Sequence, residues 1–124
     1  MKTPRASGFT LIELVIAMSV IGILAAIAVP KFIDLSDDAT KAAKSGMSGA
    51  VKSSHAIAVA DLKRFPTNAE LATYVNGDGV SPAADGINVT IDGTVHTVIT
   101  YADSNCVTAI TTPTDTVECV GEIP

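Results

Sequence analysis

One long apolar segment dominates the first third of the chain. Residues 9–29 contain a single ionisable side chain, that of Glu13. A helix of these 21 residues would be about 31 Å long, which is enough to cross the hydrocarbon core of a membrane. Lys2 and Arg5 lie on its N-terminal side, so the positive-inside rule predicts a cytosolic N-terminus and a C-terminal part outside.

A secretory signal peptide would also place basic residues before an apolar stretch. Its cleavage site would follow that stretch, with small residues leading into a polar flank. No such site follows Val29, because the chain continues through Pro30 into a second helical pattern. We therefore expect the apolar segment to be retained. Pro30 crowds the carbonyl of Ala26 and predicts a kink or local opening, and Gly22 is a second weak point in the helix.

Small and apolar residues recur at helical spacing beyond this proline, to about Lys63. The stripe that they form leaves three lysines to one side, as in an amphipathic helix. Pro66 is expected to end the helix, because it pushes Phe65 out of helical conformations. The members of the predicted stripe are Phe32, Leu35, Ala39, Ala43, Gly46, Ala50, Ile57 and Ala60.

The pattern becomes irregular and then alternating towards the C-terminus. We expect a short helical turn within residues 67–75 and a loop over residues 76–86, which are rich in Gly, Pro and Asp. Residues 107–111 and 116–120 are expected to form a strand pair around Pro113.

A hairpin is predicted between residues 87–92 and 95–101, where apolar and polar positions alternate around Asp92-Gly93. The apolar faces of the two strands coincide only if the connection has three residues or contains a bulge. The expected fold class is therefore α+β. A long N-terminal helix, kinked near Pro30, packs against an antiparallel sheet of about four strands.

Charge is unevenly distributed. Residues 31–64 carry six basic and four acidic side chains, whereas residues 65–124 carry no Lys or Arg and eight acids. Phosphate contacts need basic side chains, so no direct nucleic-acid site is evident in this domain. Solubility alone explains such a surface, but in a polymer the acidic face of one copy could meet the basic helix of the next. The eight acids are Glu70, Asp78, Asp85, Asp92, Asp103, Asp115, Glu118 and Glu122.

The C-terminal domain of 60 residues is small enough to need a covalent staple. Cys106 and Cys119 are the only cysteines. If bridged, they would close a short loop and stabilise the domain by about 3 kcal/mol. The alternative is a pair of buried thiols. The export segment favours a disulfide, because disulfides persist outside the cytosol.

Glu13 is the chemical anomaly of the apolar segment. An unpaired carboxylate there would cost several kcal/mol, and the next ionisable residue is Lys31, 18 positions later. One interpretation places Glu13 near the membrane interface, where it stabilises the positive end of the helix dipole. The other requires a cation made by processing. Cleavage after Gly8 would free the α-amino group of Phe9, which could neutralise Glu13 of a neighbouring copy and fix the register of packed helices.

These residues resemble a known signature. A short basic leader ends in Gly8 and is followed by Phe9-Thr10-Leu11-Ile12-Glu13-Leu14. This order resembles the cleavage and methylation signature of the type IV pilin superfamily, and the likeness continues through residues 22–30. Residues 30–39 are similar to the start of the exposed helix in pilins of the mannose-sensitive haemagglutinin type.

The resemblance implies an organisation for the whole chain. The leader peptide would be residues 1–8, the transmembrane and filament-core helix residues 9–30, the exposed amphipathic half of that helix residues 31–64, and the loop and sheet domain with its disulfide residues 65–124. A prepilin peptidase would cleave between Gly8 and Phe9 and N-methylate Phe9. Glu13, Phe9, Gly22 and Pro30 would act in assembly.

The implied function is that of a structural pilin of a bacterial type IV pilus, serving adhesion, motility or uptake. Its partners would be further copies of itself, the peptidase, the inner-membrane assembly machinery and, before assembly, membrane lipid. The chain would first be a single-pass protein of the inner membrane, with its C-terminus outside, and then part of an extracellular filament. The alternatives are a pseudopilin of a type II secretion or competence system, and a singly anchored membrane domain that keeps its N-terminus.

Catalytic interpretations have little support. His55 and His96 have no Cys or carboxylate at metal-ligand or triad spacing. Residues 76–79 with Asp85 resemble a fragment of a calcium loop, but the full spacing and the terminal Glu are missing. A turn-rich loop is the simpler interpretation. We expect no enzymatic activity, no cofactor and no metal.

Overall fold

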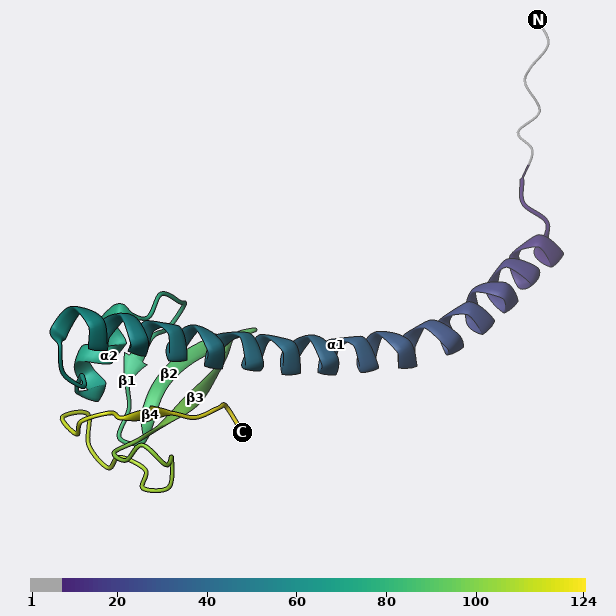
Figure 1. The fold of residues 1–124 in the computed structure, drawn as a ribbon. Coiled ribbons are helices and arrows are strands. Elements are labelled where there is room, and N and C mark those ends of the chain that lie inside the picture. The colour runs from purple at the N-terminus through teal and green to yellow at the C-terminus, as the bar shows by residue number, and fades with distance from the viewer. Residues whose placement is uncertain (1–7) are drawn as a thin grey trace, which may run out of the picture. The chain divides into compact units, whose positions relative to one another are not determined.

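The computed structural model describes residues 8–124. The predicted leader, apart from Gly8, therefore lies outside the described residues. The chain divides into two compact units after Asp37, and each is described by itself. One helix, α1 (Leu11–Leu62), contributes to both and forms the long spiral in Figure 1. It continues through Pro30 without ending, so the two predicted helical sections are one element. A kink at Pro30 stays a prediction.

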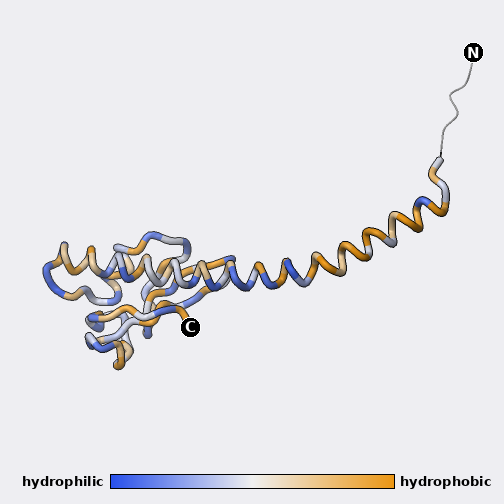
Figure 2. The backbone as a smooth tube through the Cα atoms, turned by 45° about the vertical axis from the view of Figure 1, so that its right-hand side comes forward, coloured by the Kyte–Doolittle hydropathy of each residue, from blue (hydrophilic) through white to orange (hydrophobic). Residues whose placement is uncertain are grey.

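The first unit presents its apolar side chains on all sides. Every residue from position 8 to position 39 is exposed in the single chain. Figure 2 shows most of this part of α1 as an apolar tube, which is interrupted near its start and again towards its end. The helix is long and apolar enough to cross a membrane. A helix that is apolar all round is stable only when lipid or other protein surrounds it.

The second unit packs the C-terminal half of α1 and a short helix, α2 (Asn68–Tyr74), against one antiparallel sheet. The strand order is β1-β2-β3-β4. The strands are β1 (Ser81–Pro82), β2 (Gly86–Ile91), β3 (Thr94–Tyr101) and β4 (Cys119–Val120). The predicted fold class, a long helix with a four-stranded sheet, and the predicted short helix are thus confirmed.

The hairpin of β2 and β3 has a two-residue connection, with Ile91 paired directly to Thr94. Asp92 and Gly93 both have positive φ, 50° and 74°, as a type I′ turn requires. With this register the apolar faces of the two strands do not coincide. The face with Ile87, Val89 and Ile91 enters the core together with Val98 and Thr100, while Val95 on the opposite face is 61% exposed.

The predicted strand pair around Pro113 is wrong. β4 pairs with β3 instead, and the fourth strand is β1, inside the segment that we expected to be a loop. The carboxylate of Asp103 accepts hydrogen bonds from the amides of Val107 and Thr108, and Asp115 does the same for two threonine amides. These amides are satisfied locally by side chains, so a ladder is not needed to pair them.

The predicted stripe of α1 is also largely wrong over the second unit, although its member Ala43 does pack against the core. The face that packs on the sheet carries Ser48, Val51, Ser54 and Ala58, whereas Ile57 is 61% exposed. Serine could be buried there because its hydroxyl bonds within the helix, as Ser48 Oγ does to the carbonyl of Lys44 at 2.8 Å. This contact removes much of the cost of burying a polar group.

A buried asparagine ties α2 to the sheet. The Asn68 amide nitrogen donates to the carbonyls of Ala83 and Gly86 at 2.9 and 2.8 Å, and its oxygen accepts from the Thr100 hydroxyl at 3.3 Å. Leu71, from the next turn of α2, is fully buried in the same core. The second unit is therefore held by a small apolar core with one satisfied polar anchor.

Candidate assembly site

Glu13 closes a capping box at the start of α1. Thr10 donates to Glu13 Oε2 through its backbone nitrogen at 2.8 Å and its hydroxyl at 2.9 Å, and the Glu13 amide returns a bond to Thr10 Oγ1 at 3.3 Å. The Thr10 carbonyl accepts from the amide of Leu14, as the residue before a helix does. Thr10 was not expected to matter, although its three-residue spacing from Glu13 is the sequence signal of such a box.

The second unit repeats this motif with one addition. Thr67 and Glu70 form a capping box at the start of α2. Arg64 adds a two-pronged contact to the same carboxylate, at 2.6 Å to Oε1 and 3.0 Å to Oε2. The Arg64 guanidinium, with a contribution from the Thr67 amide, lowers the pKa of Glu70 to about 2. A capping carboxylate in this chain can thus bind a helix end and a cation at once.

Glu13 has no such cation within the described chain. The ion pairs among residues 8–124 join Lys41 to Asp38, Lys52 to Glu122 and Arg64 to Glu70. Within residues 8–124, the side-chain contacts of Glu13 use Oε2, and its amide bonds to Thr10, so Oε1 is open to a partner from another molecule. The geometry therefore combines a fixed carboxylate with a vacant oxygen, in the segment expected to lie in a low-dielectric environment.

The predicted processing and assembly residues are all accessible. Phe9 is 93% exposed, and Gly8, Gly22 and Pro30 are exposed as well. A Cβ atom added to Gly8 or Gly22 would meet no atom within 4 Å. The packing of the described chain therefore requires glycine at neither position, so any such requirement must come from another molecule.

The disulfide between Cys106 and Cys119 is present, as predicted, with the two Cα atoms 5.5 Å apart. It joins the segment after β3 to the first residue of β4. Backbone amides near this disulfide lower the pKa values of two carboxyls. The Thr108 amide is the main cause for Asp103, and the Thr111 amide is the main cause for Asp115. This loop is organised by a covalent bond and by carboxylates that cap its turns.

The residues considered for metal or catalytic roles make structural contacts. A ring nitrogen of His55 lies 2.9 Å from the carbonyl of Val117, and the ring stacks on Phe65. The backbone oxygens of Asp78 and Asp85 accept from amides of β2 and β3 and so extend the sheet. Over residues 8–124, no group of three His, Cys, Asp or Glu residues is arranged to hold a metal.

Comparison with known proteins gives the family. Residues 3–29 match the model of the prokaryotic N-terminal methylation motif. The chain is 48% identical over 77 residues to the type IV narrow pilus major component PilA5 of Thermus thermophilus. The chain belongs to the type IV pilin superfamily.

A second relative of this pilin-superfamily chain is the type IV major pilin protein PilA of Myxococcus xanthus, 39% identical over 79 residues. The matched stretches cover 62% and 64% of this chain, and 65% of PilA5 and 33% of PilA. The pilin-superfamily chain thus spans less than two thirds of either relative. No solved structure matches it.

Proposed function

We propose that this chain is the precursor of a structural pilin, which polymerises through α1 into an extracellular type IV pilus. The observation that carries the proposal is the first part of α1, which is exposed and, as far as Pro30, apolar on every side apart from Glu13, in a chain with the methylation motif. Such a surface needs lipid before assembly and other helices after it. The role is structural rather than catalytic, and both relatives bear the names of pilus subunits.

Processing creates the cation that Glu13 lacks. A prepilin peptidase cleaves between Gly8 and Phe9 and N-methylates Phe9. The bonds from Thr10 to Glu13 lie on the C-terminal side of that cut, so the capping box survives it. The new α-amino group of Phe9 in one copy then pairs with Oε1 of Glu13 in its neighbour, much as Arg64 pairs with Glu70. The pair sets the register of the packed helices.

The proposed cellular course follows from these steps. The chain first sits in the inner membrane as a single-pass protein with its C-terminal unit outside, and an inner-membrane assembly machine then moves it into the filament. A pseudopilin of a secretion or competence system would share the N-terminus. The relatives' names, which are those of pilus components, favour the pilus.

Mass spectrometry of filaments sheared from cells tests the proposal. We expect this chain to be the filament subunit, with Phe9 at its N-terminus and the added mass of one methyl group. The Gly8→Val variant is expected to accumulate as uncleaved precursor, because the peptidase requires a residue without a side chain there. Gly22→Ala is the matched control, since Gly22 is equally free of contacts, and it should be cleaved normally.

Two results would count against a pilin. Finding the leader still attached in surface filaments would remove the processing step. A protein that keeps its leader and stays in the membrane as a monomer would indicate a singly anchored domain instead.

A further inference from the structure

A groove of about 350 Å³ lies between α1 and the C-terminal segment of the second unit. Lys41, Lys44 and Ser48 line it from the helix, and Glu122 and Ile123 line it from the segment. Three contacts hold its walls together: the Ile123 amide donates to Ser48 Oγ at 3.0 Å, Lys44 Nζ to an oxygen of Pro124 at 2.8 Å, and Lys52 Nζ to Glu122 at 3.2 Å. The groove is thus a built feature of the fold.

The charged side chains around the groove differ in how closely they are paired with opposite charges. Glu122 is paired with Lys52, so the acid of the groove already has its cation. Within residues 8–124, the ion pair that Lys41 forms is with Asp38, at 3.9 Å, and both side chains are 78% exposed. An exposed pair at that distance contributes little. The ammonium group of Lys41, at the rim of the groove, can therefore bind a carboxylate of another molecule.

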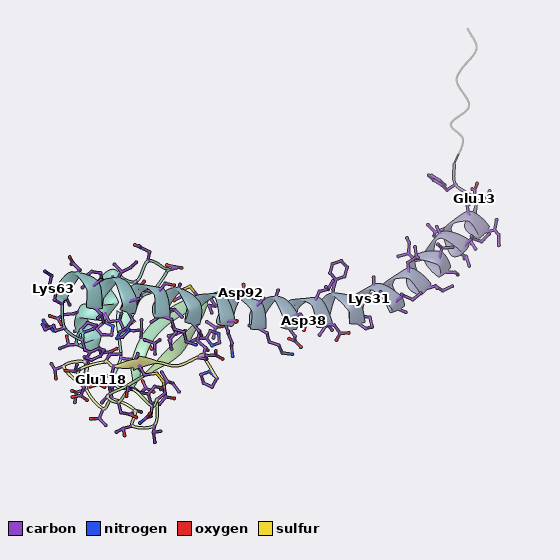
Figure 3. All side chains as sticks on the ribbon, viewed as in Figure 1. Glu13, Lys31, Asp38, Lys63, Asp92 and Glu118 are labelled. Carbon is purple, nitrogen blue, oxygen red and sulfur yellow. A yellow bond between two sulfur atoms is a disulfide. The ribbon has the colours of Figure 1, made fainter. Side chains whose placement is uncertain are left out.

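The C-terminal unit of another copy is a matching source of carboxylates. Residues 65–124 contain eight acids and no Lys or Arg. Figure 3 shows one of these acids, Glu118, well away from Asp38 on α1, although both belong to the second unit. An acid on that side of the unit can approach the groove of a different molecule more readily than its own.

We propose that this groove receives an acidic side chain from the C-terminal unit of a second copy, with Lys41 as its principal contact and Lys44 beside it. The inference rests on the proposed function, because a filament holds the copies at high effective concentration. Pairing of complementary charges would then help to select the partner surface and its register. Ser48 and Ile123 form the uncharged interior of the groove.

Zero-length carbodiimide coupling in filaments tests the inference directly, because it joins only amines and carboxylates already in contact. Cells shifted from unlabelled to 15N medium supply both kinds of subunit to one filament. We expect peptides with Lys41 or Lys44 joined to an acidic peptide from residues 65–124 of the other isotope. Lys52 is the internal control and should couple to Glu122 of the same isotope, because that pair lies within one chain.

Charge reversal provides the second measurement. Lys41→Glu should lower the yield of sheared filaments about ten-fold, because it places like charges in contact, while Lys41→Arg should assemble normally. Lys63→Glu is the matched control. Lys63 is exposed and just follows α1, at the opposite end of this part of the helix from Asp38 (Figure 3).

The outcomes are distinguishable. Filaments that show the Lys52 coupling but no mixed-isotope coupling of Lys41 or Lys44 would overturn the inference and leave the proposed function intact. Normal yield from Lys41→Glu would overturn it too. If the wild-type chain forms no filaments at all, the proposed function fails and the inference fails with it.

Discussion

At the scale of single residues, Glu13 has two separable roles. Its carboxylate caps α1 through Thr10, and in the proposed function the same carboxylate would also pair with a cation from another copy. The first role needs only a hydrogen-bond acceptor at the third helical position, whereas the second needs a negative charge. Glutamine satisfies the first role and lacks the second, because Gln also serves in capping boxes.

The Glu13→Gln variant should therefore be cleaved and methylated normally but form few or no filaments. The Glu13→Ala variant should also form few or no filaments, and it should in addition lose the cap of α1. Electron microscopy of sheared material, with mass spectrometry of the membrane fraction, measures both effects. Normal filaments from Glu13→Gln would mean that the cap alone matters and that no charge pair forms.

At the scale of elements, a salt bridge between Arg64 and Glu70 joins the segment after α1 to the start of α2. Arg64 lies two residues after the end of α1 and binds Glu70, which also caps α2. Tyr74, at the end of α2, donates to Asp61 at 2.5 Å, and this carboxylate raises the pKa of the tyrosine. The turn between the helices is thereby held at two points. The Glu70 carboxyl of the first contact titrates at a pH that can be reached in an unfolding experiment.

Stability should fall as the pH is lowered from about 4.5, the ordinary pKa of Glu70, towards about 2, its value in the folded chain. A carboxyl whose pKa is lowered by folding stabilises the native state above its unfolded pKa, and this contribution is lost as acid protonates it. Thermal unfolding of the full chain in detergent, from pH 6 to pH 2, measures the effect.

The Glu70→Gln variant is the control for the other carboxyls, since Asp103 and Asp115 also have lowered pKa values. It should melt below the wild type at pH 6, and the difference should shrink towards zero at pH 2. A difference that does not change with pH would show that the charge of Glu70 contributes nothing.

At the scale of the whole molecule, each unit lacks something that a stable globular protein has. The first unit has no core, and every described residue up to position 39 is exposed. The second has a small core of eleven buried apolar residues, Leu71 and Ile87 among them. The disulfide compensates for this small core by restricting the unfolded chain.

Reduction of the Cys106–Cys119 bond, which closes a loop with a sequence separation of 13, should lower the melting temperature by roughly 10–20 °C, because such a bond contributes about 3 kcal/mol. Circular dichroism of the full chain, with and without reductant, tests this. The double variant Cys106→Ala, Cys119→Ala should melt with the reduced wild type and be indifferent to reductant. An unchanged melting temperature on reduction would contradict the prediction.

The sequence by itself determined the features that depend on local or covalent chemistry. Helical and alternating periodicity predicted α1 and the hairpin, and the order of residues around Glu13 predicted the family. Two cysteines in a domain expected to be exported predicted the disulfide. Each of these depends on neighbours in the chain or on a small number of possibilities, so the residue types alone were sufficient.

Only the tertiary structure decided which faces are buried and which strands pair. The buried face of α1 runs through Ser48 and Ser54, because their size suits a close approach to the sheet and hydroxyls can bond within the helix, as that of Ser48 does. Residues 107–111 do not pair with residues 116–120. Ala109 instead forms a single antiparallel bridge with Tyr101 of β3, while the amides of Val107 and Thr108 bond to Asp103. Contacts between distant segments compete with one another, and a local sequence pattern does not show which of these contacts will form.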